Sequence, residues 1–214
     1  DLLATRLMEA VGNIDRKLDG ISAYFVPSNA GVKAFADLHK RGVAVRMLTN
    51  SMEATDVLPV HAGYAKHRKD MLESGVSLFE LRKKVAPCDV TKHLGLFGSS
   101  GASLHTKTFA VDGERIFVGS FNFDPRSTRL NTEMGILISS EKMAQNLHKA
   151  FDESMGGLTW QVKLHDGKLV WIDSNGNSDS SSQNEKVLTS EPGSSALRSL
   201  MLTVVGWLPV EWLL

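Results

Sequence analysis

Two basic side chains near the middle of the chain, His105 and Lys107, have the types and spacing needed for phosphoryl chemistry. They lie in LHTKTFAV, which has the pattern of a strand, and alternate residues of a strand project to the same face. A neutral imidazole can attack phosphorus to give a phosphohistidine, and a neighbouring ammonium can neutralise the charge on the phosphate oxygens. The pair therefore predicts a phosphate-handling site.

Three polar residues on the following segments can complete such a site. Ser120 and Asn122 stand two residues apart after the predicted strand RIFVGS, and both can orient phosphate oxygens by hydrogen bonding. Glu133, in LNTEMGI, is a carboxylate that can hold the imidazole of His105 in one tautomer and stabilise its charged form. The two strands of this segment flank a hairpin turn at Asp112.

Each of these residues also has an ordinary structural explanation. A His-x-Lys pair on a strand usually lies on a solvated face, and Asp-Gly is usually only a turn. The serine and the asparagine can cap a loop, and Glu133 can pair with Arg129 at the surface. What favours a functional site is the order of the residues along the chain, not any one of them.

In that order the residues resemble a known signature. LHTKTFAVDGERIFVGSFNFDPRS followed by NTE is similar to the His-x-Lys-x4-Asp signature of the phospholipase D superfamily, with its downstream Gly-Ser-x-Asn and Glu. The resemblance implies that His105 is the nucleophile or the general acid and that Glu133 orients it. It assigns phosphate binding to three residues, Lys107, Ser120 and Asn122. Asp112 belongs to the same catalytic signature, although its place at a hairpin turn favours a structural role.

The resemblance extends over most of the chain to one branch of that superfamily. LTNSMEATDVLPVHAGYAKHRKDMLESGVSLFEL and the tail EPGSSALRSLMLTVVGWLPVEWLL are similar to the bacterial cardiolipin synthases, especially their C type. This branch implies phosphatidyl transfer onto phosphatidylglycerol from phosphatidylethanolamine or a second phosphatidylglycerol, with cardiolipin as the product. It also implies peripheral attachment to the cytoplasmic side of the bacterial inner membrane, and no metal or cofactor.

The family pattern is only half present. Members of the superfamily assemble one site from two His-Lys-Asp motifs, and this sequence contains one. His67 does not begin a second, because Ser74 stands where the aspartate is required and the segment has a helical pattern. We expect the second histidine to come from a segment before residue 1 or from a second copy of the chain. The first is favoured, because the sequence begins without Met and has a synthase-like tail.

The elements that must position these residues are of two kinds. Before the signature, the pattern predicts a helix over DLLATRLMEAVG and three strands, ISAYFV, VAVRMLT and VSLFEL. Helices alternate with these strands, one from Ser28 or Asn29 to Arg41 and one over HAGYAKHRKDMLES, with Gly42 and Gly75 after their last turns. Such alternation is typical of a parallel α/β sheet, which gathers ligands at the carboxyl ends of its strands.

From residue 104 on, antiparallel elements are predicted. The signature hairpin is followed by the strand EMGILI and the helix EKMAQNLHKAFDES. The expected fold class is therefore α/β, a mixed β-sheet flanked by helices, which the resemblance makes a phospholipase D-like α-β-α sandwich. We expect a catalytic half-domain over residues 1–156 and an extension over 157–214. The extension contains the hairpin WQVKLHDGKLVWI, the polar loop SNGNSDSSSQNE and an apolar helical tail.

Composition restricts the class of substrate. Lys plus Arg and Asp plus Glu both number 24, so the chain has no broad basic field of the kind that attracts nucleic acid. Cys88 is the only cysteine, and no Cys/His cluster has zinc-ligand spacing. Phosphate binding must then be local, and phospholipids are favoured over nucleic acid as partners.

Weaker signals lie outside the signature. Five polar residues follow the strand VAVRMLT, where a parallel sheet presents its ligand crevice: Asn50, Ser51, Asp56, His61 and Tyr64. Of these, His61 and Tyr64 are candidate headgroup contacts, the alternative being a capping role for Asp56 and a core position for Tyr64. The basic run over residues 66–69 meets anionic headgroups or is a solvated helix face. The tail over residues 197–214 suits a membrane interface or a surface packed on the second half.

Two other functions remain open. A phospholipase D-type endonuclease acting as a dimer would use the same chemistry, but it should show a basic groove and no apolar tail. A catalytically silent scaffold would bind lipid phosphate in one half-site without turnover.

Overall fold

A computed structural model describes residues 2–83, 99–100, 103–129, 132–153, 155–173, 186–195 and 198 of the chain. The helices are α1 (Leu2–Val11), α2 (Asn29–Lys40), α3 (Leu58–Glu73), α5 (Pro125–Arg129) and α6 (Glu141–Glu153). The strands are β1 (Lys17–Ser22), β2 (Ala44–Asn50), β3 (Ser77–Leu81), β4 (Ser99–Ser100), β5 (Ser103–Leu104), β6 (Lys107–Val111), β7 (Arg115–Gly119), β8 (Gly135–Ser139), β9 (Thr159–His165), β10 (Lys168–Ile172) and β11 (Val187–Leu188).

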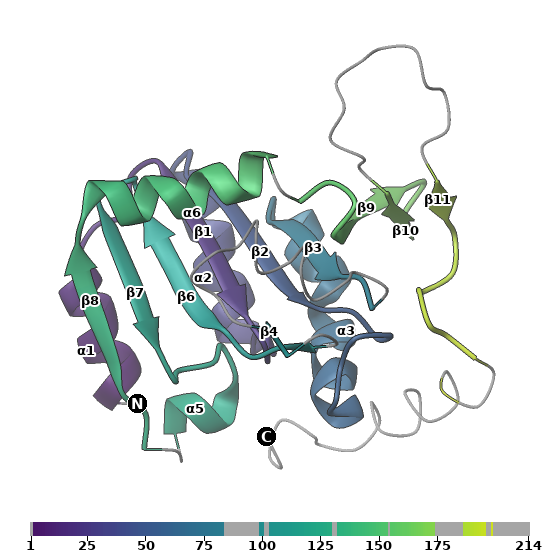
Figure 1. The fold of residues 1–214 in the computed structure, drawn as a ribbon, viewed down its shortest axis with the longest axis horizontal. Helices are drawn as coiled ribbons and strands as arrows, with labels where there is room; N and C mark the ends of the chain where they lie inside the picture. The colour runs from purple at the N-terminus through teal and green to yellow at the C-terminus, as the bar shows by residue number, and fades with distance from the viewer. Residues whose placement is uncertain are drawn as a thin grey trace.

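Within the described residues, nine strands form one mixed sheet in the order β11-β10-β9-β3-β2-β1-β6-β7-β8 (Figure 1). The pairs β1–β2 and β2–β3 are parallel, and the remaining neighbours are antiparallel. The parallel strands are those joined by helices, as the alternating pattern predicts. The antiparallel strands are those of the two predicted hairpins, β6–β7 and β9–β10, together with β8 and β11 at the two edges of the sheet.

Helices cover both faces of this sheet (Figure 1). The core on one face includes Val11 of α1, Phe35 of α2 and Tyr64 of α3, packed against buried strand residues. The core on the other face includes Leu147 and Phe151 of α6. The amphipathic helices therefore each bury one stripe against the sheet. The predicted α/β class, a mixed β-sheet flanked by helices, is confirmed.

The first strand lies earlier than the sequence pattern predicts. We expected it over ISAYFV, but β1 covers Lys17–Ser22 and contains Asp19 and Gly20. A Cβ atom at Gly20 would lie 2.7 Å from the Sδ atom of Met47, so the glycine makes room for the neighbouring strand. Asp19 is fully buried, and it lies in the strand because partners elsewhere in the chain neutralise its charge.

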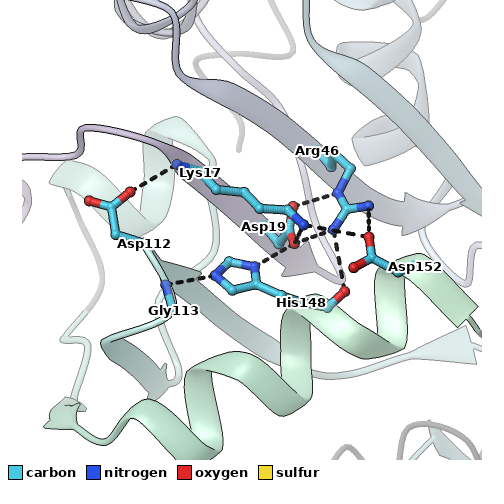
Figure 2. Close-up of polar contacts among 7 residues, drawn as sticks. All are labelled: Lys17, Asp19, Arg46, Asp112, Gly113, His148 and Asp152. Carbon is cyan, nitrogen blue, oxygen red and sulfur yellow. Dashed lines mark hydrogen bonds and ion pairs between the residues drawn. The ribbon is translucent and has the colours of Figure 1, made fainter.

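These partners form a polar cluster at the amino end of β1 (Figure 2). Arg46 donates from Nε and Nη2 to the two carboxylate oxygens of Asp19, at 2.7 and 2.6 Å. His148 accepts from the backbone N–H of Gly113 at Nε2, so its Nδ1 carries the proton that it shares with Asp19 at 2.6 Å. Burial raises the pKa of Asp19, but the hydrogen bonds from Arg46 and His148 outweigh this effect and lower it. The cluster joins β1, β2, α6 and the β6–β7 turn.

The predicted C-terminal hairpin continues the same sheet. Its first strand, β9, pairs with β3, with Leu78 opposite Val162 and Glu80 opposite Trp160. Strands from before and after residue 156 therefore belong to one sheet. The division into domains at that position stays a prediction. The predicted polar loop over residues 174–185 lies outside the described residues, as does the apolar tail apart from residue 198.

The basic run of α3 is divided, because Lys66 and Lys69 are exposed and the two residues between them are buried. Its central residues, His67 and Arg68, are 3% and 1% exposed. Arg68 lies in ion pairs with Glu80 at 3.2 Å and with Glu191 at 2.5 Å. The hydroxyl of Tyr64 donates to the same oxygen of Glu80, Oε1, at 3.0 Å. The expectation that this run as a whole meets lipid headgroups or water is therefore wrong for His67 and Arg68.

Candidate active site

The signature residues lie where β6 begins, which is the carboxyl end of the parallel strands. Lys107, the first residue of β6, is paired with Ser22, the last residue of β1. His105 lies just before β6 and not within a strand, because the chain leaves the ladder between β5 and β6. There Ala23 donates its N–H to the carbonyl of Thr106 at 3.1 Å. These residues therefore lie at the carboxyl edge, where a parallel sheet is expected to gather ligands, but the predicted continuous strand through His105 is wrong.

The His105 side chain is exposed and faces an acidic residue. Its imidazole is 58% exposed, and its Nε2 atom lies 4.0 Å from Oδ2 of Asp56, in the segment that joins β2 to α3. The hydroxyl of Tyr24 lies 3.4 Å from both carboxylate oxygens of Asp56. The imidazole is thus open to a ligand and has a carboxylate and a phenol on one side.

Lys107 supplies a cation beside this imidazole. Its Nζ donates to the backbone carbonyl of His105 at 2.8 Å and lies 5.8 Å from the ring centre of Tyr24. Partial burial lowers the pKa of Lys107, while the carboxylates of Glu133, Asp124 and Asp56 oppose this shift. A half-buried ammonium next to an exposed imidazole is suited to binding a phosphate oxygen.

Ser120 and Asn122 follow β7, and Glu133 stands just before β8. The Ser120 hydroxyl donates to Oε2 of Glu133 at 2.5 Å and accepts from the N–H of Met134 at 3.0 Å. Asn122 is buried and its Oδ1 accepts from the N–H of Tyr24 at 3.3 Å, so its amide nitrogen is the end that can donate to a ligand. The contact of Glu133 with Ser120 is compatible with its predicted role in orienting His105, which stays a prediction.

Asp112 lies at the opposite end of β6, roughly 20 Å along the strand from His105. Its carboxylate accepts three backbone N–H bonds, from Asp15, Arg16 and Lys17, at 3.0, 2.8 and 2.8 Å. Its φ of +56° places it in the left-handed region at the hairpin turn. These contacts support the structural role that the turn position favours, and they give no support to a catalytic one.

The two candidate headgroup contacts lie in the core. His61 and Tyr64 are 2% and 1% exposed. Nε2 of His61 is 2.6 Å from Oε1 of Glu191 and 3.1 Å from Nη2 of Arg68. These buried positions support the core alternative given for Tyr64. They give no support to a headgroup contact by either residue.

The other weak candidates differ among themselves. Asn50 is buried and ties two segments together, donating to the carbonyls of Ala23 and Leu104 and accepting from the N–H of Leu104. Ser51 is buried and accepts from Ala54. Only Asp56 faces the signature histidine.

Tyr24 is the site residue that sequence reasoning missed. It stands two positions after β1, at the carboxyl edge where ligands of parallel sheets gather, and this position was the available signal. It was hidden because ISAYFV has the pattern of a buried strand, in which an aromatic residue is expected to pack in the core.

The described ranges contain neither a metal-binding cluster nor a membrane-spanning helix. No group of three or more His, Cys, Asp or Glu side chains in those ranges could hold a metal ion. Among the helices of the same ranges, none combines the length and the apolar character needed to cross a bilayer.

Comparison with known proteins supports the signature. A family model described as "Cardiolipin synthase, PLD-like domain" matches residues 7–155. Cardiolipin synthase C of Escherichia coli is 44% identical over 214 residues, which are all of this chain and 44% of that protein. The chain therefore spans less than half the length of this relative.

Two solved structures share the fold. Nuc of Salmonella typhimurium, a phospholipase D family member, matches with a TM-score of 0.53 and 17% identity over 75% of this chain and 91% of that one. Phosphatidylserine synthase of Haemophilus influenzae matches with a TM-score of 0.50 and 19% identity, over 71% and 35%. At these identities the likeness shows the fold alone.

Proposed function

Since this chain belongs to the cardiolipin synthase, PLD-like family, we propose that it forms one half of the active site of a phosphatidyltransferase that makes cardiolipin. The observation that carries this proposal is the exposed imidazole of His105 with the ammonium of Lys107 beside it at the carboxyl edge of the sheet. The 44% identity to cardiolipin synthase C of Escherichia coli, which extends over the entire chain, supports the choice of reaction.

The reaction proceeds in two transfers of the same phosphatidyl group. In the first, an imidazole nitrogen bonds to phosphorus, the bond from phosphorus to the donor headgroup oxygen breaks, and the opposite imidazole protonates that oxygen. In the second, a hydroxyl of the acceptor bonds to phosphorus, the phosphorus–nitrogen bond breaks, and the proton returns to the opposite imidazole. His105 is one of these two imidazoles.

The remaining signature residues stabilise the charge that develops. Three groups bind the phosphate oxygens: the ammonium of Lys107, the amide nitrogen of Asn122 and the hydroxyl of Ser120, whose one proton turns from Glu133 to the phosphate when the substrate binds. Glu133, which already accepts from Ser120, orients the imidazole of His105. Asp112 holds the far end of the β6 hairpin and does not enter the reaction.

The substrates and partners follow from the same family. Phosphatidylglycerol is the acceptor, phosphatidylethanolamine or a second phosphatidylglycerol is the donor, and nucleic acid is not a substrate. A second histidine comes from another segment of a longer protein or from a second copy of this chain. The protein works at the cytoplasmic side of the bacterial inner membrane as a peripheral protein, and needs no cofactor.

Replacing His105 tests this function. In the full-length protein, His105→Ala should reduce cardiolipin formation from phosphatidylglycerol vesicles by about a hundredfold or more, because one of the two proton- or phosphate-carrying groups is lost. His165→Ala is the matched control, since His165 is exposed in the β9–β10 hairpin, and it should leave turnover unchanged. Undiminished turnover by His105→Ala would overturn the proposal.

Two further results separate the alternatives. Cleavage of DNA by the unaltered protein, with no lipid product, would indicate the endonuclease. Vesicle binding that depends on Lys107 but gives no product would indicate the scaffold.

A further inference from the structure

The side of His105 that faces the β2–α3 segment carries groups outside the signature. The two atoms that face each other there, Nε2 of His105 and Oδ2 of Asp56, are 4.0 Å apart, beyond hydrogen-bonding distance. Their side chains are 58% and 44% exposed, so a ligand can reach both. Tyr24 closes one side, with its hydroxyl 3.4 Å from each oxygen of the Asp56 carboxylate.

The spacing suits an oxygen atom. An atom at an ordinary hydrogen-bond distance, about 2.8 Å, can touch both Nε2 of His105 and Oδ2 of Asp56. A carboxylate only accepts hydrogen bonds, so its ligand must be a donor. A phosphate oxygen is an anionic acceptor and is repelled there, whereas an alcohol hydroxyl can donate to Asp56 and face the imidazole. The Asp56 carboxylate has a second oxygen with acceptor sites of its own, so an adjacent hydroxyl on the same ligand can donate to Asp56 as well, which a ligand with one hydroxyl cannot do.

Tyr24 holds Asp56 in this arrangement. The backbone of Tyr24 is fixed on both sides, by its N–H bond to Asn122 Oδ1 at 3.3 Å and by the hydroxyl of Ser22, which donates to its carbonyl at 2.6 Å. Burial and then the charge of Asp56 raise the pKa of Tyr24, so the phenol stays protonated at neutral pH and donates to the carboxylate. The same residue thus connects Asp56 to the phosphate-binding amide.

We propose that Asp56 and Tyr24, together with Nε2 of His105, form a subsite that binds a 1,2-diol, the headgroup of the alcohol substrate. This subsite rests on the proposed function. It assigns to these residues the selection of a polyol over water or a simple alcohol. The phosphate lies on the Lys107 side of His105, and the diol lies on the Asp56 side. Both regions are at the same carboxyl edge of the sheet.

Competition between soluble acceptors tests the subsite. Full-length protein is given phosphatidylglycerol vesicles with labelled glycerol or labelled 1-propanol, which has the same three carbons but one hydroxyl. The measured quantity is the ratio of kcat/KM for incorporation of glycerol and of 1-propanol into lipid. We expect Asp56→Asn to lower this ratio about tenfold, because the diol loses its hydrogen bond to a charged acceptor. Tyr24→Phe should lower it by less, since Asp56 remains.

The control and the contrary outcomes are distinct from those for the transferase itself. Asp37→Asn replaces another exposed carboxylate, on α2, and should leave the ratio and both rates unchanged. Equal losses of kcat/KM for glycerol and for 1-propanol in Asp56→Asn would overturn the subsite. So would an unaltered protein that shows no preference for glycerol. Failure of the transferase proposal has another signature, namely no cardiolipin from the unaltered protein even where soluble alcohols are incorporated.

Discussion

At the residue scale, the basic and the acidic signature residue at the two ends of β6 lie in contrasting environments. His105 precedes the strand and is exposed, whereas the carboxylate of Asp112 follows it and is held by three backbone donors. A ligand can reach the first and has little access to the second. One signature therefore combines an exposed imidazole with a residue that fixes the hairpin to the start of β1.

Replacing Asp112 distinguishes these roles. Asp112→Asn should lower the free energy of unfolding by about 1–3 kcal/mol, because backbone donors lose a charged acceptor, while kcat of the folded protein stays unchanged. Burial raises the pKa of Asp112, but its backbone hydrogen bonds outweigh this and lower it. Its stabilising effect is therefore present above the ordinary pKa of aspartate and is lost as pH falls through the lowered value. Urea unfolding at several pH values measures the loss of stability and its pH dependence, and an assay of the folded protein measures kcat.

Asp166→Asn is the matched control for that experiment. Asp166 also has a positive φ, +51°, at a hairpin turn before a glycine, but its side chain is 90% exposed. We expect little change in its unfolding free energy. If Asp112→Asn lost turnover while keeping its stability, the residue would be catalytic after all.

At the element scale, a buried ion cluster ties α3 and β3 to the segment before the C-terminal tail. Arg68 of α3 contacts Glu80 of β3 and Glu191, and the ring centre of Trp171 on β10 lies 5.3 Å from its guanidinium. Since α3 begins directly after the segment that carries Asp56, the cluster also supports one wall of the proposed diol subsite.

Removing one charge of this cluster should be costly. Glu191→Gln should lower the free energy of unfolding by about 3 kcal/mol, because it leaves the guanidinium of Arg68 with less compensation in the core. Glu73→Gln, which breaks an exposed pair with Lys69, is the control and should change it by less than about 1 kcal/mol. Equal effects of the two substitutions would contradict the role of the cluster.

The same cluster predicts an acid-dependent loss of stability. Burial raises the pKa of Glu191, but hydrogen bonding with His61 and the charge of Arg68 outweigh it and lower the pKa to about 2. A lowered pKa means that the contribution is complete above the ordinary value near 4.5 and disappears as pH falls toward 2. Unfolding of the unaltered protein between these pH values should show a slope that Glu191→Gln reduces.

Local patterns predicted most elements, but they failed where distant charges compensate each other. The helices over α1, α2, α3 and α6 and the β6–β7 and β9–β10 hairpins follow from periodicity and turn residues. Strand β1 was misplaced because Asp19 is polar, and its partners Arg46 and His148 are 27 and 129 positions away. Arg68 was misread as a surface residue for the same reason, since Glu191 is 123 positions away.

The candidate site stays a prediction from the order of the signature residues. The structure places Lys107 beside His105, since the two residues stand two positions apart where β6 begins. The approach of Asp56 and Tyr24 to His105 depends on how separate loops leave the sheet. No spacing in the sequence encodes that approach.

At the scale of the whole molecule, the sheet does not stop where the predicted half-domain ends. β9 pairs with β3, and Trp160 and Trp171 from the hairpin are both buried. The indole N–H of Trp171 donates to Glu80 at 2.9 Å. The hairpin therefore protects an edge of the sheet and completes the surroundings of a buried carboxylate.

Truncation tests whether residues 1–156 are an independent unit. A chain that ends at residue 156 should unfold at lower denaturant concentration and aggregate, because β3 becomes an unprotected edge strand and Arg68 loses Glu191. A chain that ends at residue 195 keeps every described strand and should unfold cooperatively. Equal unfolding midpoints for the two chains would show that the half-domain is independent of the hairpin.

The order of synthesis leaves one edge of β1 unpaired for longer than the other. β2 leaves the ribosome soon after β1, but β6, the neighbour on the other edge, begins about 85 residues after Ser22. At roughly 5–20 residues per second, that edge waits roughly 4–17 s for its partner. An unpaired strand edge is a template for wrong pairing. The nascent chain is therefore most exposed to misassociation, and most dependent on chaperones, before the β6–β7 hairpin has emerged.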